Sequence, residues 1–133
     1  MGEDDPDTNE VLLDNILDDL FKNENANQVI PTLFELIEKY PEADLGAPGP
    51  IVHTLENFDG QYEDHLFSSL NKKPAPLTVL MLNRIINALI DPIVKSKCID
   101  LMHQVSISEN ANKMAKKDAK MFYDYQMKIK ADS

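Results

Sequence analysis

The sequence predicts an all-α protein with six or seven helices, stacked as antiparallel hairpins in a helical bundle or a HEAT-like array. Apolar residues recur at the three- and four-residue spacing of a helix face in almost every segment. No segment keeps the period-two alternation of a strand, and clusters of proline and glycine separate the segments. The connections are short, which makes neighbouring helices antiparallel. Residues 1–133 are long enough for a single domain with one core.

Two helices are predicted within the first 40 residues. Residues 1–7 are acidic, include a proline and are expected to be disordered. Apolar residues at positions i, i+1, i+4, i+5, i+8 and i+9 predict a helix over 12–21. The asparagine-rich run 23–27 ends it, and a second helix follows over 29–40. This helix tolerates Pro31 in its first turn, where no backbone donor is needed, and the proline directly after residue 40 ends it.

A stiff loop and two short helices are predicted in the middle of the chain. The loop over 45–50 combines residues that restrict the backbone with residues that free it, so we expect it to hold one shape. These structural residues are Gly46, Pro48, Gly49 and Pro50. Pro50 also suits the first turn of a helix over 50–58. A glycine turn separates it from a helix over 62–70, which a proline-rich turn follows.

Three longer helices are predicted in the second half of the chain. Residues 77–90 are apolar almost all round, which is typical of a central buried helix. Asp91 followed by Pro92 predicts the N-cap and the first turn of the next helix, which continues to residue 105. The last helix is rich in lysine and is predicted over 108–133, beginning at Ser108.

The predicted central helix carries one polar stripe, formed by Asn83, Arg84 and Asn87. If the helix is buried, these side chains must either reach the surface or find partners inside the protein. The two amides can bond the carbonyls of the loop over 45–50. Arg84, the only arginine in the chain, can form a forked pair with a carboxylate of the acidic half. A structural role is favoured over direct contact with a partner.

Charge is distributed unevenly along the chain. Residues 1–65 carry 17 Asp and Glu against two Lys, a net −15, whereas residues 66–133 carry six acids against 11 basic residues, a net +5. A strongly negative field repels nucleic acid and anionic membranes and attracts a basic partner. The sequence therefore predicts no nucleic-acid partner and no membrane partner, and it favours a protein that blocks a cationic one. The alternative is a solvated acidic surface that only maintains solubility.

The candidate partner-binding residues lie in the acidic half. Two of them share a polar stripe of the first predicted helix, and the others surround the turn between the third and fourth helices. They are Asp14, Asp18, Glu56, Asp59, Tyr62, Glu63 and Asp64. The cluster at the turn is the favoured contact, because it is dense, and Tyr62 is its candidate aromatic anchor. For any single carboxylate, a solvated acidic face remains the alternative.

No motif predicts an enzyme, a metal site or a cofactor. A glycine-rich phosphate loop is absent, and the single cysteine, Cys98, cannot build a thiolate zinc site. Asp100 and His103 supply only one of the two acid-x-x-His pairs of a di-metal bundle, which makes a metal enzyme the weakest reading. Cys98 and His103 point roughly 140° apart on one helix, so they cannot act as nucleophile and base. Cys98 is predicted to be a small buried hydrophobe.

A cytoplasmic location is predicted from three features. The N-terminus lacks the basic start and apolar run of a signal peptide. The longest nearly apolar run, 77–90, is too short and too polar to cross a bilayer. A single cysteine fits a reducing compartment.

Three segments in order carry a resemblance to a known family. They are LGAPGPIVHTLE over 45–56, YEDHL over 62–66 and KPAPLTVLMLNRIIN over 73–87. Together they resemble small bacterial immunity proteins that are encoded beside polymorphic or contact-dependent growth-inhibition toxins. The resemblance covers roughly residues 28–105. It implies a protein that binds its cognate toxin domain in the cytoplasm and blocks it, and many such toxins are nucleases with basic active sites.

Two functions from different classes are therefore predicted. The first is an immunity protein that neutralises a basic toxin domain, with no catalysis and no cofactor of its own. The alternative is an all-α interaction scaffold or adaptor with an unrelated partner. A toxin gene directly upstream of the gene for this chain would favour the first.

Overall fold

The computed structural model describes residues 26–41, 50–58 and 60–132. This part of the chain is all-helical, with six helices and no strand, which confirms the predicted fold class. The helices are α2 (Ala26–Lys39), α3 (Pro50–Glu56), α4 (Glu63–Lys72), α5 (Pro76–Ala88), α6 (Pro92–Ser106) and α7 (Lys113–Asp132). The segment predicted to be disordered (1–7), the helix predicted over 12–21 and most of the loop over 45–50 lie outside the described residues.

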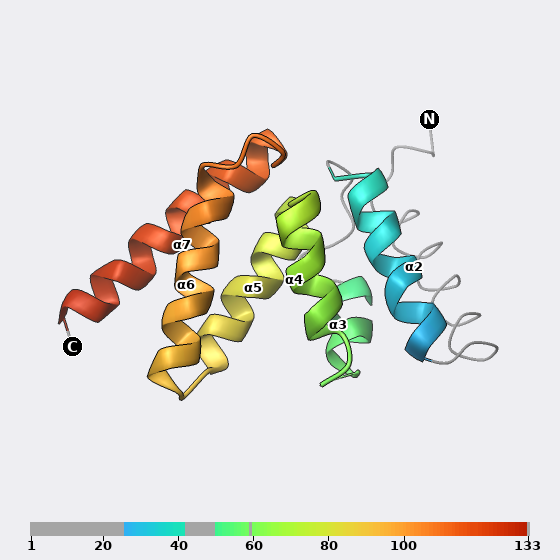
Figure 1. Cartoon of the computed structure of the whole chain (residues 1–133), viewed down its shortest axis with the longest axis horizontal. Coiled ribbons are helices and arrows are strands. Elements are labelled where there is room, and N and C mark those ends of the chain that lie inside the picture. Colours follow the sequence, from blue (N-terminus) through green and yellow to red (C-terminus); the bar gives the residue numbers. More distant parts are fainter. Residues whose placement is uncertain (1–25, 42–49, 59, 133) are drawn as a thin grey trace.

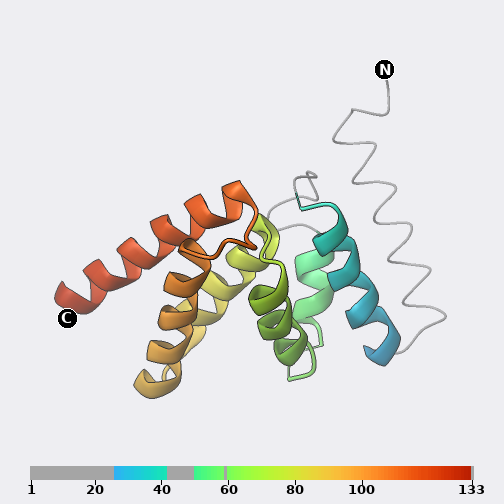
Figure 2. The same ribbon diagram turned by 45° about the horizontal axis from the view of Figure 1, so that its top comes forward.

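The helices follow one another along the long axis of the molecule, from α2 at one end to α7 at the other (Figures 1 and 2). From α4 onward, consecutive helices run in opposite directions, as expected for stacked hairpins (Figure 1). The main contacts join α2 with α4, α4 with α5, α5 with α6, and α7 with both α5 and α6. The helix α5 is therefore in the middle, as its nearly uniform apolar sequence predicts. None of the described helices combines the length and apolar character that a membrane span requires.

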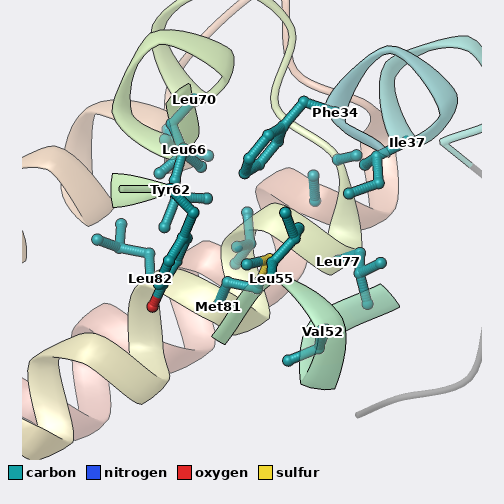
Figure 3. Close-up of a cluster of buried hydrophobic side chains, with 14 of the residues drawn as sticks. Phe34, Ile37, Val52, Leu55, Tyr62, Leu66, Leu70, Leu77, Met81 and Leu82 are labelled. Atoms are coloured by element: carbon teal, nitrogen blue, oxygen red, sulfur yellow. The ribbon is translucent and has the colours of Figure 1, made fainter. Parts of the chain in front are cut away.

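The core lies between α5 and the helices that surround it. Figure 3 shows side chains from α2, α3, α4 and α5 gathered in one cluster. The labelled members are Phe34, Ile37, Val52, Leu55, Tyr62, Leu66, Leu70, Leu77, Met81 and Leu82, all buried. Further along the chain, Met102 and Val105 of α6 and two alanines of α7 extend the same core. The residues that mark each helix face in the sequence are thus the ones that pack together.

The start of α6 agrees with its sequence signal. The carboxylate of Asp91 accepts hydrogen bonds from the backbone N–H groups of Ile93 (2.9 Å) and Val94 (3.4 Å). These are two of the donors that have no partner inside the helix. Pro92 occupies the first helical position, where its missing N–H costs nothing. The predicted cap is confirmed.

The start of α7 corrects the sequence prediction. The helix begins at Lys113 and not at Ser108. The side-chain oxygen of Asn112 accepts hydrogen bonds from the N–H groups of Met114 (2.9 Å) and Ala115 (3.2 Å), so Asn112 is the cap. The hydroxyl of Ser108 accepts one from the N–H of Asn110 (3.2 Å), which closes a local turn before the helix. Serine is common both as a helix N-cap and in local turns, so the sequence alone does not distinguish these two roles.

The helix α2 differs from the prediction at one end only. It begins at Ala26, so Pro31 lies in its second turn and not in its first. There the proline removes a backbone hydrogen bond to the carbonyl of Asn27. The other end agrees, because the helix stops at Lys39, two residues before Pro41.

Candidate functional site

Three residues of the predicted acidic cluster, Glu56, Tyr62 and Glu63, meet at a hollow in the surface between α3, α4 and α5. Its volume is about 340 Å³. Glu56 comes from the end of α3, Tyr62 and Glu63 from the start of α4, and Arg84 from α5. The rest of the lining is apolar and belongs to α5 and the residue after it: Ile85, Ala88 and Leu89. Three of the predicted cluster residues thus line one hollow, together with Arg84, to which the sequence assigned a separate role.

A forked ion pair forms one wall of the hollow. Arg84 donates from Nε to Oε2 of Glu56 (2.7 Å) and from Nη2 to Oε1 (2.8 Å). This is the forked pair with a carboxylate of the acidic half that the sequence suggested for Arg84. The hydrogen bond from Arg84 lowers the pKa of Glu56 below its usual range, although partial burial opposes this. Glu56 is therefore ionised and already paired with Arg84, so its carboxylate is not free.

Tyr62 does not form the predicted aromatic anchor. Only 5% of the residue is exposed. Figure 3 shows its ring inside the core, beside Leu66 and Leu82. Tyr62 directly precedes α4 and turns its ring toward α5, so it holds the two helices together. The prediction that Tyr62 projects toward a partner is therefore wrong, because its side chain points from the turn into the hydrophobic core.

The turn between α3 and α4 is shaped by Gly60 and Glu63. Gly60 has φ +86°, a backbone conformation that residues with a side chain rarely adopt. Both carboxylate oxygens of Glu63 accept a hydrogen bond from the N–H of Gly60, at 2.9 and 3.1 Å. Glu63 also lies in the first turn of α4, where a negative charge is favourable. Its carboxylate thus stabilises the turn as well as facing the hollow.

Asp64 and Glu35 are the exposed carboxylates of this half that make no ion pair within the described part of the chain. Asp64 lies in the first turn of α4, and Glu35 lies on α2. Of the other predicted partner-binding residues, Asp14, Asp18 and Asp59 lie outside the described residues. Among the predicted contacts that are described, Asp64 alone keeps a free carboxylate.

The polar stripe of α5 contacts two neighbouring helices: Arg84 pairs with α3, as described above, and the two asparagines bond to α7. Gln126 of α7 donates from Nε2 to the side-chain oxygens of Asn83 (3.2 Å) and Asn87 (2.8 Å). Gln126 is only 2% exposed, so these bonds satisfy a buried amide. The loop carbonyls that were the expected partners lie outside the described residues, as do Gly46, Pro48 and Gly49. Pro50, the last residue of the loop, is the first residue of α3, as predicted.

Sequence reasoning missed Gln126, although a signal was present. On α7 it follows Ala115, Ala119 and Phe122 at helical spacing, so it is the one polar residue on the buried face. A polar residue in such a position requires a partner inside the protein. The polar stripe on α5 offers such partners, so the two could have been matched.

The remaining candidates for chemistry are separated in the structure. No group of three or more His, Cys, Asp or Glu gathers as a metal site among the described residues. Cys98 is buried, as predicted, and burial raises the pKa of its thiol, which disfavours the nucleophilic thiolate. His103 instead contacts the ring of Tyr123, at 4.7 Å between ring centres.

The ion pair at the hollow gives a first testable prediction. Replacing Arg84 by alanine is expected to lower the free energy of unfolding by about 1–2 kcal/mol. The effect is smaller than for a fully buried pair, because 39% of the Arg84 side chain and 28% of the Glu56 side chain are exposed. The matched control is Lys120→Ala, which removes an ion pair with Asp124 that is exposed on both sides (72% and 59%) and should cost less than about 0.5 kcal/mol.

The same pair predicts a pH dependence. The pKa of Glu56 is lower in the folded than in the unfolded protein, so the stabilisation is present at neutral pH. It is lost as the pH falls through the folded-state pKa, because the carboxylate then becomes neutral. Urea unfolding of wild type and Arg84→Ala between pH 7 and about pH 2 should therefore show a difference that shrinks in acid. A difference that is constant with pH would show that Arg84 acts by packing and not by its charge.

Comparison with models of protein families, with curated protein sequences and with solved structures finds no match to this chain. The resemblance to bacterial immunity proteins thus rests on the three segments quoted above, and the assignment of function remains a proposal.

Proposed function

We propose that this chain is an immunity protein that binds a basic toxin domain, such as a nuclease, and blocks its active site. The observation that carries this proposal is the separation of charge, with a net −15 in residues 1–65 and +5 in residues 66–133. The resemblance of the segments within residues 28–105 supports it. Carboxylates of the acidic half would occupy the groove in which the toxin holds the phosphates of its substrate.

The contacts of the acidic side chains guide where we propose that such a partner binds. Glu56 accepts hydrogen bonds from Arg84, and Glu63 accepts one from the N–H of Gly60. Both carboxylates are therefore already bonded within the protein. Asp64 is exposed at the start of α4 and directly follows Glu63, which lines the hollow. Glu35 is a second exposed carboxylate, on α2. We therefore propose that Asp64 contacts the partner, together with the sequence-predicted Asp14, Asp18 and Asp59.

The test is a triple charge reversal with a matched control. The site variant carries Asp14→Lys, Asp18→Lys and Asp64→Lys. The control carries Asp100→Lys, Glu109→Lys and Asp132→Lys, which changes the net charge equally at exposed positions of the second half. Reversal at Glu56 or Glu63 is avoided, because it would also break contacts that hold the fold. Circular dichroism of both variants checks that they remain helical.

The partner in this experiment is the product of the neighbouring toxin gene, and the readouts are its association rate and the protection of cells. Between about 50 mM and about 500 mM salt we expect the wild-type association rate to fall markedly. At low salt the site variant should associate at least about tenfold more slowly than the control, and it should no longer protect cells. A rate that is insensitive to salt, or a site variant that protects as well as the control, would contradict the proposal. It would favour an all-α interaction scaffold with an unrelated partner.

A further inference from the structure

The outer side of α7 carries a stripe of large apolar side chains. Met121, Tyr125 and Ile129 follow one another at four-residue spacing, and Met114 lies two turns before them. Each is between 43% and 57% exposed. The opposite side of α7 packs on α5 and α6, so the stripe faces away from the body of the protein. Figure 1 shows α7 at the end of the row of helices, where no further described helix covers it.

An apolar groove continues this stripe at its C-terminal end. It lies between the start of α6 and the last turns of α7 and has a volume of about 280 Å³. Pro92 and Ile99 of α6 line it together with Ile129 of α7, which also belongs to the stripe. We call the stripe and the groove together the α7 face. A groove next to an exposed row of apolar residues can accept an anchoring side chain of a partner.

The charges around the α7 face are mixed, with lysines in excess: Asp118 and Asp132 fall on the line of the stripe by helical spacing, whereas four lysines lie beside it or line the groove. Lys117 and Lys128 lie beside the stripe, are exposed and make no ion pair within the described part of the chain. Lys95 and Lys130 line the groove, and no carboxylate does. Over its whole length α7 has six lysines against three aspartates. A partner that covers the apolar stripe therefore gains from acidic groups at its edges.

We propose that the α7 face binds an acidic amphipathic helix of a partner protein. The stripe from Met121 to Ile129 extends about 12 Å along the axis of α7, at 1.5 Å per residue, and is slightly inclined to it, which suits the apolar face of a second helix packed on α7. Methionine and tyrosine are typical of such contact surfaces, because one adapts its shape and the other offers a large rigid area. This surface is separate from the acidic one and opposite to it in charge.

Two other occupants fit the observations less well. An anionic bilayer also attracts a lysine-rich amphipathic helix. However, outside residues 113–132, which are net +3, the chain is net −13 and would be repelled. A symmetric dimer through α7 would bring together two helices that are each net +3. A helix of the opposite charge has neither disadvantage.

The test uses two designed peptides and two variants of the full chain. Both peptides have about 18 residues with leucines at helical spacing, and the remaining positions are glutamate in one and lysine in the other. Binding is followed by fluorescence anisotropy of the labelled peptide. The variant Tyr125→Glu introduces a charge into the stripe, whereas Tyr40→Glu introduces it at a comparably exposed tyrosine on the far end of the protein. Circular dichroism verifies that both variants remain folded.

We expect the acidic peptide to bind wild type and Tyr40→Glu equally, and to bind Tyr125→Glu at least about tenfold more weakly. The lysine peptide should bind none of them measurably. Equal binding of both peptides, or equal weakening by the two substitutions, would overturn the proposal. It would also be overturned if Tyr125→Glu instead abolished cosedimentation with phosphatidylglycerol vesicles, or self-association in ultracentrifugation, while the acidic peptide failed to bind. These outcomes do not depend on the acidic surface, so they are distinguishable from failure of the proposed toxin-binding function.

Discussion

Replacing Leu82 by alanine is expected to lower the free energy of unfolding by about 2–5 kcal/mol. Leu82 has no exposed surface and lies on α5, the helix that contacts α4, α6 and α7. Figure 3 shows it beside the ring of Tyr62. Alanine removes apolar contacts and leaves a cavity, since neighbours held by several helices can close it only in part.

The measurement is urea unfolding followed by circular dichroism, with Ile90→Ala as the matched control. Ile90 comes from the same apolar stretch of sequence but is 95% exposed just after α5. Its truncation should change the free energy of unfolding by less than about 0.5 kcal/mol. If both substitutions cost the same, α5 is not the central helix that its contacts indicate.

Replacing Ala119 by leucine is expected to cost about 1–3 kcal/mol, the second largest effect. Ala115 and Ala119 are completely buried where α7 packs on its neighbours, so this interface is built on small side chains. A leucine at position 119 must push α7 outward. The displacement would also strain the hydrogen bonds from Gln126 to Asn83 and Asn87, which reach across the same interface.

The control for this substitution is Ala131→Leu, which adds the same side chain to an exposed position of α7. It should leave the unfolding midpoint in urea nearly unchanged, whereas Ala119→Leu lowers it. A stable Ala119→Leu protein would mean that α7 can shift outward without loss. In that case the small buried side chains of Ala115 and Ala119 are not required to hold α7 against α5 and α6.

Much of the fold could be predicted because local signals agree with tertiary packing. Asp91 and Pro92 define the start of α6 by themselves, since a carboxylate cap and a proline at the first position suit no other local structure as well. The apolar run of α5 likewise indicates burial on several sides. The errors lie at helix starts, where serine and proline are compatible with more than one backbone path. Ser108 forms a turn and Pro31 lies one turn deeper than expected.

The candidate site was predictable in composition but not in orientation. Spacing along the chain indicated that Glu56, Tyr62 and Glu63 lie near one turn, and all three line the hollow. It could not indicate that Tyr62 points inward, because a tyrosine between two helices suits both the core and the surface. Nor could it identify Glu56 as the partner of Arg84, 28 positions away, because that choice depends on how α3 and α5 cross.

The order of the helices along the molecule has a consequence for how the protein folds. The main interhelical contacts join neighbours or next neighbours in sequence. The relative contact order is therefore low, and few long loops must close before stabilising contacts form. Such a topology favours rapid folding, and it allows the end helices to open while the centre stays closed. In native-state hydrogen exchange the amides of α2, which packs mainly on α4 within the described residues, would then exchange by local opening, and those of α5 only by global unfolding.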